Sequence, residues 1–187
     1  MRNKQDFIIN YRPENGDAVF FEGLSNPFSV RVFNRFEVDN AKHLIVYSTP
    51  PDLKALKDML GKAKPQKVTF VFNDSIDSAE DILKKAAGII KFIISNKKGK
   101  TSYAELICLL GLNYEIINII IQYLNSSGLI EVEEDYDDLI IIKGTGEKKS
   151  YAEKFKQSFS MLAAEMNSFK SYIRAARLET LMTAYKE

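Results

Sequence analysis

The segment from Ser78 to Lys143 constrains the fold most, because its capping and stop residues divide it into a fixed order of short elements. Apolar residues recur at helical spacing over residues 82–93, which predicts a first helix that begins at Ser78. Two acids follow Ser78, where they suit the start of a helix. A polar break over residues 96–100 ends this helix, and the elements beyond it are shorter.

The shorter elements have clear limits. Gly111 ends a short helix that begins at Thr101 or Ser102, since glycine readily takes the left-handed conformation beyond a helix. Asn113 caps the next helix, and Gly128 follows it. The predicted elements are helices over 101–110 and 113–124 and strands over 129–134 and 139–143. Helix, short helix, glycine turn, helix and hairpin in this order predict a winged helix-turn-helix.

The first third of the chain is predicted to be β-rich. Runs of Phe, Ile, Val and Tyr predict strands over residues 6–12, 18–23, 30–38, 43–48 and 67–73. The Asn15-Gly16 step indicates a hairpin after the first strand. Between the last two strands lies a helix that Thr49 or Asp52 caps and that ends near Gly61 and Pro65. Strand, helix and strand form a β-α-β unit.

These patterns place the chain in the α/β (α+β) class, with a β-α-β half, a winged helix and a long C-terminal helix. A polar break over residues 73–78 predicts domains at 1–76 and 77–144, followed by a helical extension over 145–187. The extension reads as helix over 150–186, and Ser168 is a possible interruption. Its predicted apolar stripe consists of Phe155, Phe159, Leu162, Met166, Phe169, Tyr172 and Ile173.

Composition limits the cellular setting. The 187 residues contain one cysteine, Cys108, in an apolar run, so we expect a core residue and no internal disulfide. That fits a reducing compartment such as the cytoplasm. The N-terminal residues 1–7 lack the apolar region of a signal peptide, and no apolar stretch approaches the roughly 20 residues of a membrane span.

Catalytic chemistry finds little support in the residues. The single histidine, His43, has no cysteine near it for zinc and reads as a strand-edge residue. The acids between Glu131 and Asp138 lack the pattern of a calcium loop and read as a solvated hairpin tip. Gly144-Thr145-Gly146 lacks the third glycine and the setting of a phosphate loop, which favours a linker. We therefore expect no catalytic residue, metal or cofactor in this chain.

Charge argues against conventional DNA docking by the winged helix. Residues 101–142 carry eight acids and no Lys or Arg, so this stretch has charge −8 and the remainder must carry +9 to give the net +1. Phosphate neutralisation by Lys and Arg provides most of the affinity for DNA. A third helix and wing of this charge would repel the backbone, although Tyr114, Asn118 and Gln122 are polar enough to contact bases.

The basic residues lie on either side of this acidic stretch. They are either solvated faces or a cationic surface for single-stranded nucleic acid or an acidic peptide. The candidate binding residues are Lys84, Lys91, Lys97, Lys98, Lys100, Lys148, Lys149 and Arg174. Aromatic residues among or near these charges, mostly read as core, are Tyr103, Tyr151, Phe155 and Tyr172.

Several phrases resemble the C-terminal accessory region of RecJ-type exonucleases, specific for single-stranded DNA, from Gram-positive-like bacteria. The first runs from His43 (HLIVYSTPPDLKAL) and continues at Lys64 (KPQKVTFVFN). The second is the winged helix with LNSSGLI at residues 124–130, and the third is KSYAEKF at residues 149–155 with the terminal helix. The similarity covers roughly Asn40 to the end. The family commonly has Asp-Leu-Pro where this chain has Ser48-Thr49-Pro50.

The resemblance implies an accessory module rather than an enzyme. The Asp-His-His motif and further metal ligands of the family's catalytic half have no counterpart here, so its manganese- or magnesium-dependent cleavage is not carried over. Implied partners are single-stranded DNA or the tail of a single-strand-binding protein, together with a catalytic exonuclease core. The alternative is a protein–protein scaffold, oligomeric or not, in which the third helix and the acidic wing form the contact surface. A transcription regulator is disfavoured by the −8 stretch.

Overall fold

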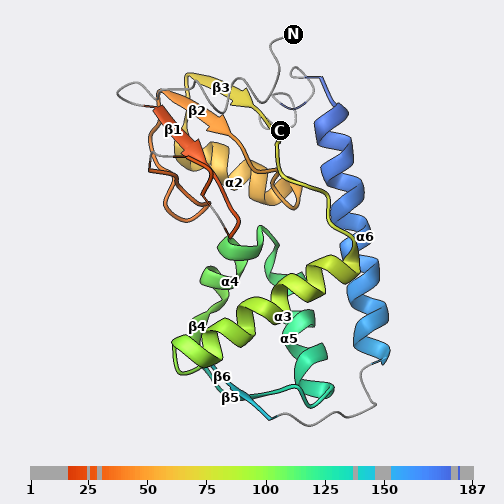
Figure 1. Ribbon diagram of the computed structural model, residues 1–187. Coiled ribbons are helices and arrows are strands. Elements are labelled where there is room, and N and C mark those ends of the chain that lie inside the picture. Colours follow the sequence, from red (N-terminus) through yellow and green to blue (C-terminus); the bar gives the residue numbers. More distant parts are fainter. Residues whose placement is uncertain are drawn as a thin grey trace. The chain divides into compact units, whose positions relative to one another are not determined.

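A computed structural model describes residues 17–24, 26–28, 31–136, 139–145, 153–177 and 181. The chain divides into two compact units, and Figure 1 shows their helices and strands. The first contains Met1–Ile76 and Phe169–Glu187, and the second contains Asp77–Ser168. The class is α+β, with two three-stranded sheets and a long C-terminal helix among the described residues, as the sequence predicts.

The first unit is built on a parallel sheet. Strands β1 (Asp17–Phe20), β2 (His43–Val46) and β3 (Lys67–Phe70) pair in that order, and helix α2 (Leu53–Ala63) connects β2 to β3. The predicted β-α-β unit is therefore confirmed. The Asp52 carboxylate caps α2 by accepting a hydrogen bond from the Ala55 amide at 2.7 Å.

Strand alternation gives this sheet two apolar faces. On one face, Leu44 and Val46 pack with the apolar side of α2, whose buried residues include Leu56, Met59 and Leu60. The other face is a smaller cluster of Val19, Ile45, Tyr47 and Val71, against which Phe21, Phe28 and Val32 pack. Because both faces are covered, this short sheet reads as near-continuous apolar runs in the sequence.

One prediction in this unit is wrong. Residues 31–38 form no strand: their backbone pairs with the sheet only through a bridge between Phe20 and Phe33, while Val32 and Val38 pack their side chains against it. The Asn34 side chain ends the extended run, since its oxygen accepts hydrogen bonds from the amides of Phe36 and Glu37. Helix α2 ends at Ala63, with Lys64 as the left-handed cap, and so ends between Gly61 and Pro65 as the sequence predicts. The predicted strand at 6–12 and the Asn15-Gly16 hairpin lie outside the described residues.

The second unit contains the three helices and the hairpin in the order that the sequence predicts. Its elements are α3 (Ala79–Asn96), β4 (Lys100–Ser102), α4 (Tyr103–Leu110), α5 (Tyr114–Ser126), β5 (Ile130–Tyr136) and β6 (Leu139–Gly144). A three-residue turn beginning with Gly111 joins α4 to α5, which meet at 104°. Side chains of Ser78, Ser102 and Asn113 cap α3, α4 and α5.

Strand β4 is not predicted by the sequence. It is three residues long and pairs with β6, so the sheet order is β4-β6-β5. Gly99 precedes it at φ +78°, and a Cβ built there would lie 2.0 Å from the carbonyl oxygen of Ile142. The close approach lets the Ile142 amide donate to the Gly99 carbonyl at 3.0 Å, so pairing with a distant strand creates β4.

Helix α6 (Glu153–Ala175) is longer than any other described helix, and Ser168 does not interrupt it. The Ser168 hydroxyl donates to the Ala164 carbonyl at 2.8 Å and so stays inside the helix. Residues of α6 through Ser168 belong to the second unit, and those from Phe169 belong to the first. This division differs from the predicted one, in which residues 145–187 form a separate helical extension. Tyr172, predicted to lie in the apolar stripe, is 58% exposed.

Two further observations concern the apolar helices. No single helix among the described residues is both long and apolar enough to cross a membrane; only α4 and α5 taken together pass by length and composition, and they are bent at the break between them. Cys108 on α4 is half-buried, where the sequence predicts a core residue. The core of the unit instead contains Leu106 and Ile107 from the same helix.

Candidate functional site

A buried polar cluster lies where the parallel strands of the first unit end. Glu22 follows β1, Ser48 and Thr49 follow β2, and Asp74 follows β3. Carboxyl ends of parallel strands are the usual place for ligands in open α/β sheets, which makes this edge a candidate site. Glu22, Ser48 and Thr49 are all buried.

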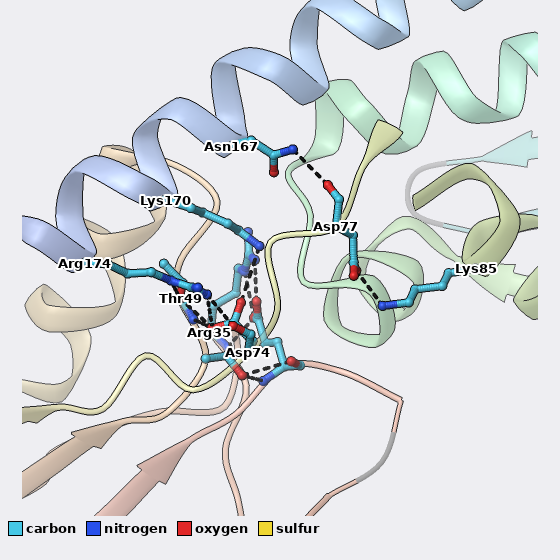
Figure 2. A network of polar contacts seen from close by, with 10 residues as sticks. Arg35, Thr49, Asp74, Asp77, Lys85, Asn167, Lys170 and Arg174 are labelled. Carbon is cyan, nitrogen blue, oxygen red and sulfur yellow. Dashed lines mark hydrogen bonds and ion pairs between the residues drawn. The ribbon is translucent and has the colours of Figure 1, made fainter. Parts of the chain in front are cut away.

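Asp74 is the centre of this cluster (Figure 2). Its carboxylate accepts hydrogen bonds from the amide of Thr49 at 2.7 Å and from its hydroxyl at 2.5 Å. Two cations of α6 pair with the same carboxylate, Arg174 at 3.0 Å and Lys170 at 3.6 Å. Arg174 also donates to the Thr49 hydroxyl and to the Asp74 carbonyl.

Glu22 forms the second ion pair of the cluster. The Glu22 side chain is 1% exposed, and its carboxylate forms a bidentate ion pair with the Arg35 guanidinium. The same carboxylate accepts a hydrogen bond from the Arg35 backbone amide at 3.1 Å. Ser48 exchanges hydrogen bonds with the Glu22 backbone, donating to its carbonyl and accepting from its amide, both at 2.9 Å. The carboxylates of the cluster are therefore saturated by partners within the chain.

This arrangement suits a structural clamp better than a reactive centre. Buried charges are tolerated when each is paired and hydrogen-bonded, and both carboxylates meet that condition. The clamp joins the last turns of α6 to the sheet. Arg174, one of the candidate DNA-binding residues, is thus engaged with Thr49 and Asp74 in the first unit, whereas the lysines of α3 belong to the second.

In the second unit, polar contacts tie the entry of α3 to α6. Asn167 donates to the Asp77 carbonyl at 2.8 Å, and Lys85 pairs with the Asp77 carboxylate at 2.5 Å (Figure 2). Lys84 pairs one turn back with Glu80 at 2.8 Å. The hydrogen bond to Glu80, followed by its charge, raises the pKa of Lys84. These two lysines already have carboxylate partners.

The remaining predicted lysines differ in their engagement. Lys97 pairs with Glu105 at the start of α4. Lys91, Lys98 and Lys100 are exposed, and the described residues provide no ion pair for any of them. They lie on α3, in the turn after it and at the start of β4. The predicted Lys148 and Lys149 lie outside the described residues.

Helix α5 and the hairpin of β5 and β6 have the acidic surface that the sequence predicts. Glu115 on α5 and Glu131 and Glu133 on β5 are exposed. The nearest cation, Lys143 on β6, pairs with Glu133, and that hydrogen bond raises the pKa of Lys143. A phosphate backbone brought to this surface would meet carboxylates, so the geometry supports the sequence argument against major-groove docking.

An exposed aromatic side chain, Phe92, was missed by the sequence analysis. It lies on α3 and is 57% exposed, whereas Tyr103, which the sequence offered as an aromatic candidate, is buried. Phe155 is half-buried, and Tyr151 lies outside the described residues. The sequence contains a signal for this exposure, because Phe92 lies outside the apolar stripe of the helix to which Ile89 and Ile93 belong.

His43 is less isolated than its sequence position indicates. Its Nε2 atom lies 2.9 Å from the Thr69 hydroxyl and its Nδ1 atom 3.6 Å from the Asp17 carboxylate. Thr, His and Asp in this order resemble a nucleophile–base–acid relay. The Asp17 separation exceeds hydrogen-bond range, and the three residues stand on neighbouring strands, which favours a polar cross-strand contact.

Neither metal ligation nor similarity to other proteins adds a function. Within the described part of the chain, no group of three or more His, Cys, Asp or Glu side chains is placed to hold a metal ion. No protein-family model, no curated protein and no solved structure matches this chain.

Proposed function

We propose that this chain is a non-catalytic, cytoplasmic accessory module of a single-stranded-DNA-specific exonuclease, and that it binds single-stranded DNA through α3 and the turn into β4. One observation carries the proposal. From Ile82 to Lys100 the chain contains six lysines and no Asp or Glu, and Lys91, Lys98 and Lys100 are exposed without an ion pair among the described residues. The RecJ-like phrases suggest the enzyme that the module serves.

The physical basis is release of counterions from a polyanion. Each phosphate neutralised by a lysine releases condensed cations and adds to the binding free energy. Lysines that already pair with carboxylates contribute less, because binding must replace that pair. We therefore assign the main contribution to Lys91, Lys98 and Lys100, with Lys84 and Lys97 secondary.

A fluorescence anisotropy titration with labelled oligothymidylate at low salt tests the proposal. Replacing Lys91, Lys98 and Lys100 together with glutamine should weaken binding by about tenfold or more. A matched control replaces three exposed lysines of the first unit, Lys42, Lys54 and Lys67, and changes the net charge equally. Lack of binding by the unaltered chain, or equal losses in both triple variants, rejects the proposal.

An acidic peptide is the other ligand for the same lysines. The tail of a single-strand-binding protein is such a peptide, and it would compete with DNA for Lys91, Lys98 and Lys100. Titrating the labelled oligonucleotide complex with an acidic tail peptide distinguishes the two ligands. Tight peptide binding without any DNA binding would show that the ligand of these lysines is a protein partner and not nucleic acid.

The alternative function, a protein–protein scaffold, is favoured by the start of α5. Tyr114 is 53% exposed, although its ring lies 4.7 Å from that of buried Tyr103, and Leu129 is 40% exposed after the same helix. Partly exposed aromatic and aliphatic residues without neighbouring cations suit a dimer contact. Analytical ultracentrifugation should then find a dimer that Tyr114→Ser weakens, and a strict monomer at high concentration would exclude this function.

A further inference from the structure

Phe92 stands out on the proposed binding surface. Its exposed fraction, 57%, contrasts with Ile89, Ile90 and Ile93, which are buried in the core of the second unit. A single exposed apolar residue is ordinary on a protein surface and carries no function by itself. Phe92 differs in its setting, because Lys91 precedes it and no acid occurs from Ile82 to Lys100.

Gly88 lies four residues before Phe92, on the same face of α3. A Cβ built on Gly88 would have no atom within 4 Å, so close packing does not require glycine there. Glycine inside a helix costs about 0.5–1 kcal/mol relative to alanine. Long helical side chains lean back over the preceding turn, yet no atom of the Phe92 ring comes within 4 Å of the Cβ position of Gly88, so open space lies between the ring and that glycine.

We propose that Phe92 and the gap at Gly88 form a base-stacking platform, and that the ligand of α3 is an unstacked base of single-stranded nucleic acid. The inference rests on the proposed function and specifies its ligand. An aromatic ring beside lysines binds single strands by stacking, without sequence preference. An acidic peptide would use the lysines but gain little from the ring.

Two probes separate stacking from charge. Oligothymidylate and an abasic oligonucleotide of equal length carry the same phosphates, but only the first has bases. Phe92→Leu should weaken oligothymidylate binding by about tenfold, within the range for one stacked base. It should leave abasic binding unchanged. Tyr172→Leu is the matched control, because Tyr172 is 58% exposed on α6 in the first unit, and it should alter neither affinity.

The chain contains no tryptophan, so a single introduced indole reports its own environment. Phe92→Trp should retain oligothymidylate binding, and stacking on a base should quench its fluorescence. The abasic probe should bind with little quenching. Tyr172→Trp provides the comparison, and its fluorescence should not respond to either oligonucleotide.

Gly88 provides a test in which stability and binding change in opposite directions. Gly88→Ala should raise the melting temperature by restricting the unfolded chain, yet weaken oligothymidylate binding about threefold or more by filling the gap. Gly61→Ala in α2 is the matched control, since Gly61 is also an exposed helical glycine without neighbours at its Cβ position. That variant should gain stability without losing affinity.

The outcomes separate the two proposals. Failure of the unaltered chain to bind either probe rejects the proposed function and the stacking platform with it. Equal affinity for both probes, or a Phe92→Leu variant that binds like the unaltered chain, rejects the platform alone. Selective loss of oligothymidylate binding, together with quenching in Phe92→Trp, supports it.

Discussion

The Asp74 carboxylate binds the Arg174 guanidinium at 3.0 Å, across 100 residues of sequence. The contact joins the end of β3 to the last turn of α6 within one compact unit. Lys170 shares the same carboxylate, and its side chain is 8% exposed. Asp74 therefore neutralises one buried cation, Lys170, and one partly buried cation, Arg174, whose side chain is 21% exposed.

Asp74→Asn should lower the free energy of unfolding by about 2 kcal/mol, because it removes a charged acceptor and leaves buried Lys170 and partly buried Arg174 without their counter-charge. The amide oxygen of the new asparagine can still accept the hydrogen bonds of Thr49. The loss of stability therefore measures the contribution of the Asp74 charge. Urea unfolding followed by far-ultraviolet circular dichroism measures it. Glu80→Gln, which removes the partner of exposed Lys84, is the control and should leave stability unchanged within error.

Gly99→Ala should destabilise the second unit by more than about 2 kcal/mol. Residue 99 has φ +78°, and the added methyl group would meet the Ile142 carbonyl of β6. Amide hydrogen exchange should show faster exchange at the Ile142 amide, which donates to Gly99. Gly88→Ala is the contrast within the same unit and should be stabilising. A neutral Gly99→Ala would contradict this placement of β4.

Asn113→Ala should lower stability by about 1 kcal/mol through loss of the cap of α5. The Asn113 side-chain oxygen accepts from the Ile116 amide at 3.0 Å, and alanine leaves that donor without a side-chain partner. Asn113→Ser retains an acceptor and should recover most of the loss. Thermal unfolding of the three proteins checks the order, and equal melting temperatures would argue against capping.

The salt dependence of DNA binding should respond to the three exposed lysines. Binding to single strands weakens with salt by a slope of about 0.7 per neutralised phosphate in a double-logarithmic plot. Replacing Lys91, Lys98 and Lys100 with glutamine should therefore flatten the slope by about 2. The variant lacking Lys42, Lys54 and Lys67 should keep the slope of the unaltered chain. Anisotropy titrations over a series of salt concentrations provide the comparison.

Local signals predicted the helices of the second unit well, because helix limits depend on nearby residues. The caps Ser78 and Asn113 and the stop at Gly111 lie within a few residues of the amides and carbonyls that they satisfy. Strand β4 was missed, since its backbone partners come from β6, about 40 residues later. The run at 30–38 was predicted as a strand because the sequence did not reveal which backbone its residues would pair with.

The candidate site divides in the same way. Composition alone established that residues 101–142 are acidic and that six lysines without an acid precede them. Which lysines are exposed without a carboxylate partner depends on ion pairs such as Lys97–Glu105, which form between neighbouring elements of the fold. The exposure of Phe92 follows from its position on the helix face opposite the core, which the helical period of the sequence indicates. Phe92 was not predicted to be exposed because an apolar residue is usually assigned to the core.

By itself, therefore, the sequence determined the class, the order of the helices and the sign of charge along the chain, because each arises from residues close together in sequence. Tertiary structure decided the Asp74–Arg174 pair, the pairing of β4 with β6 and the division of α6 between two compact units. These features depend on which distant groups approach one another as the core closes, and helical or strand periodicity carries no record of that choice.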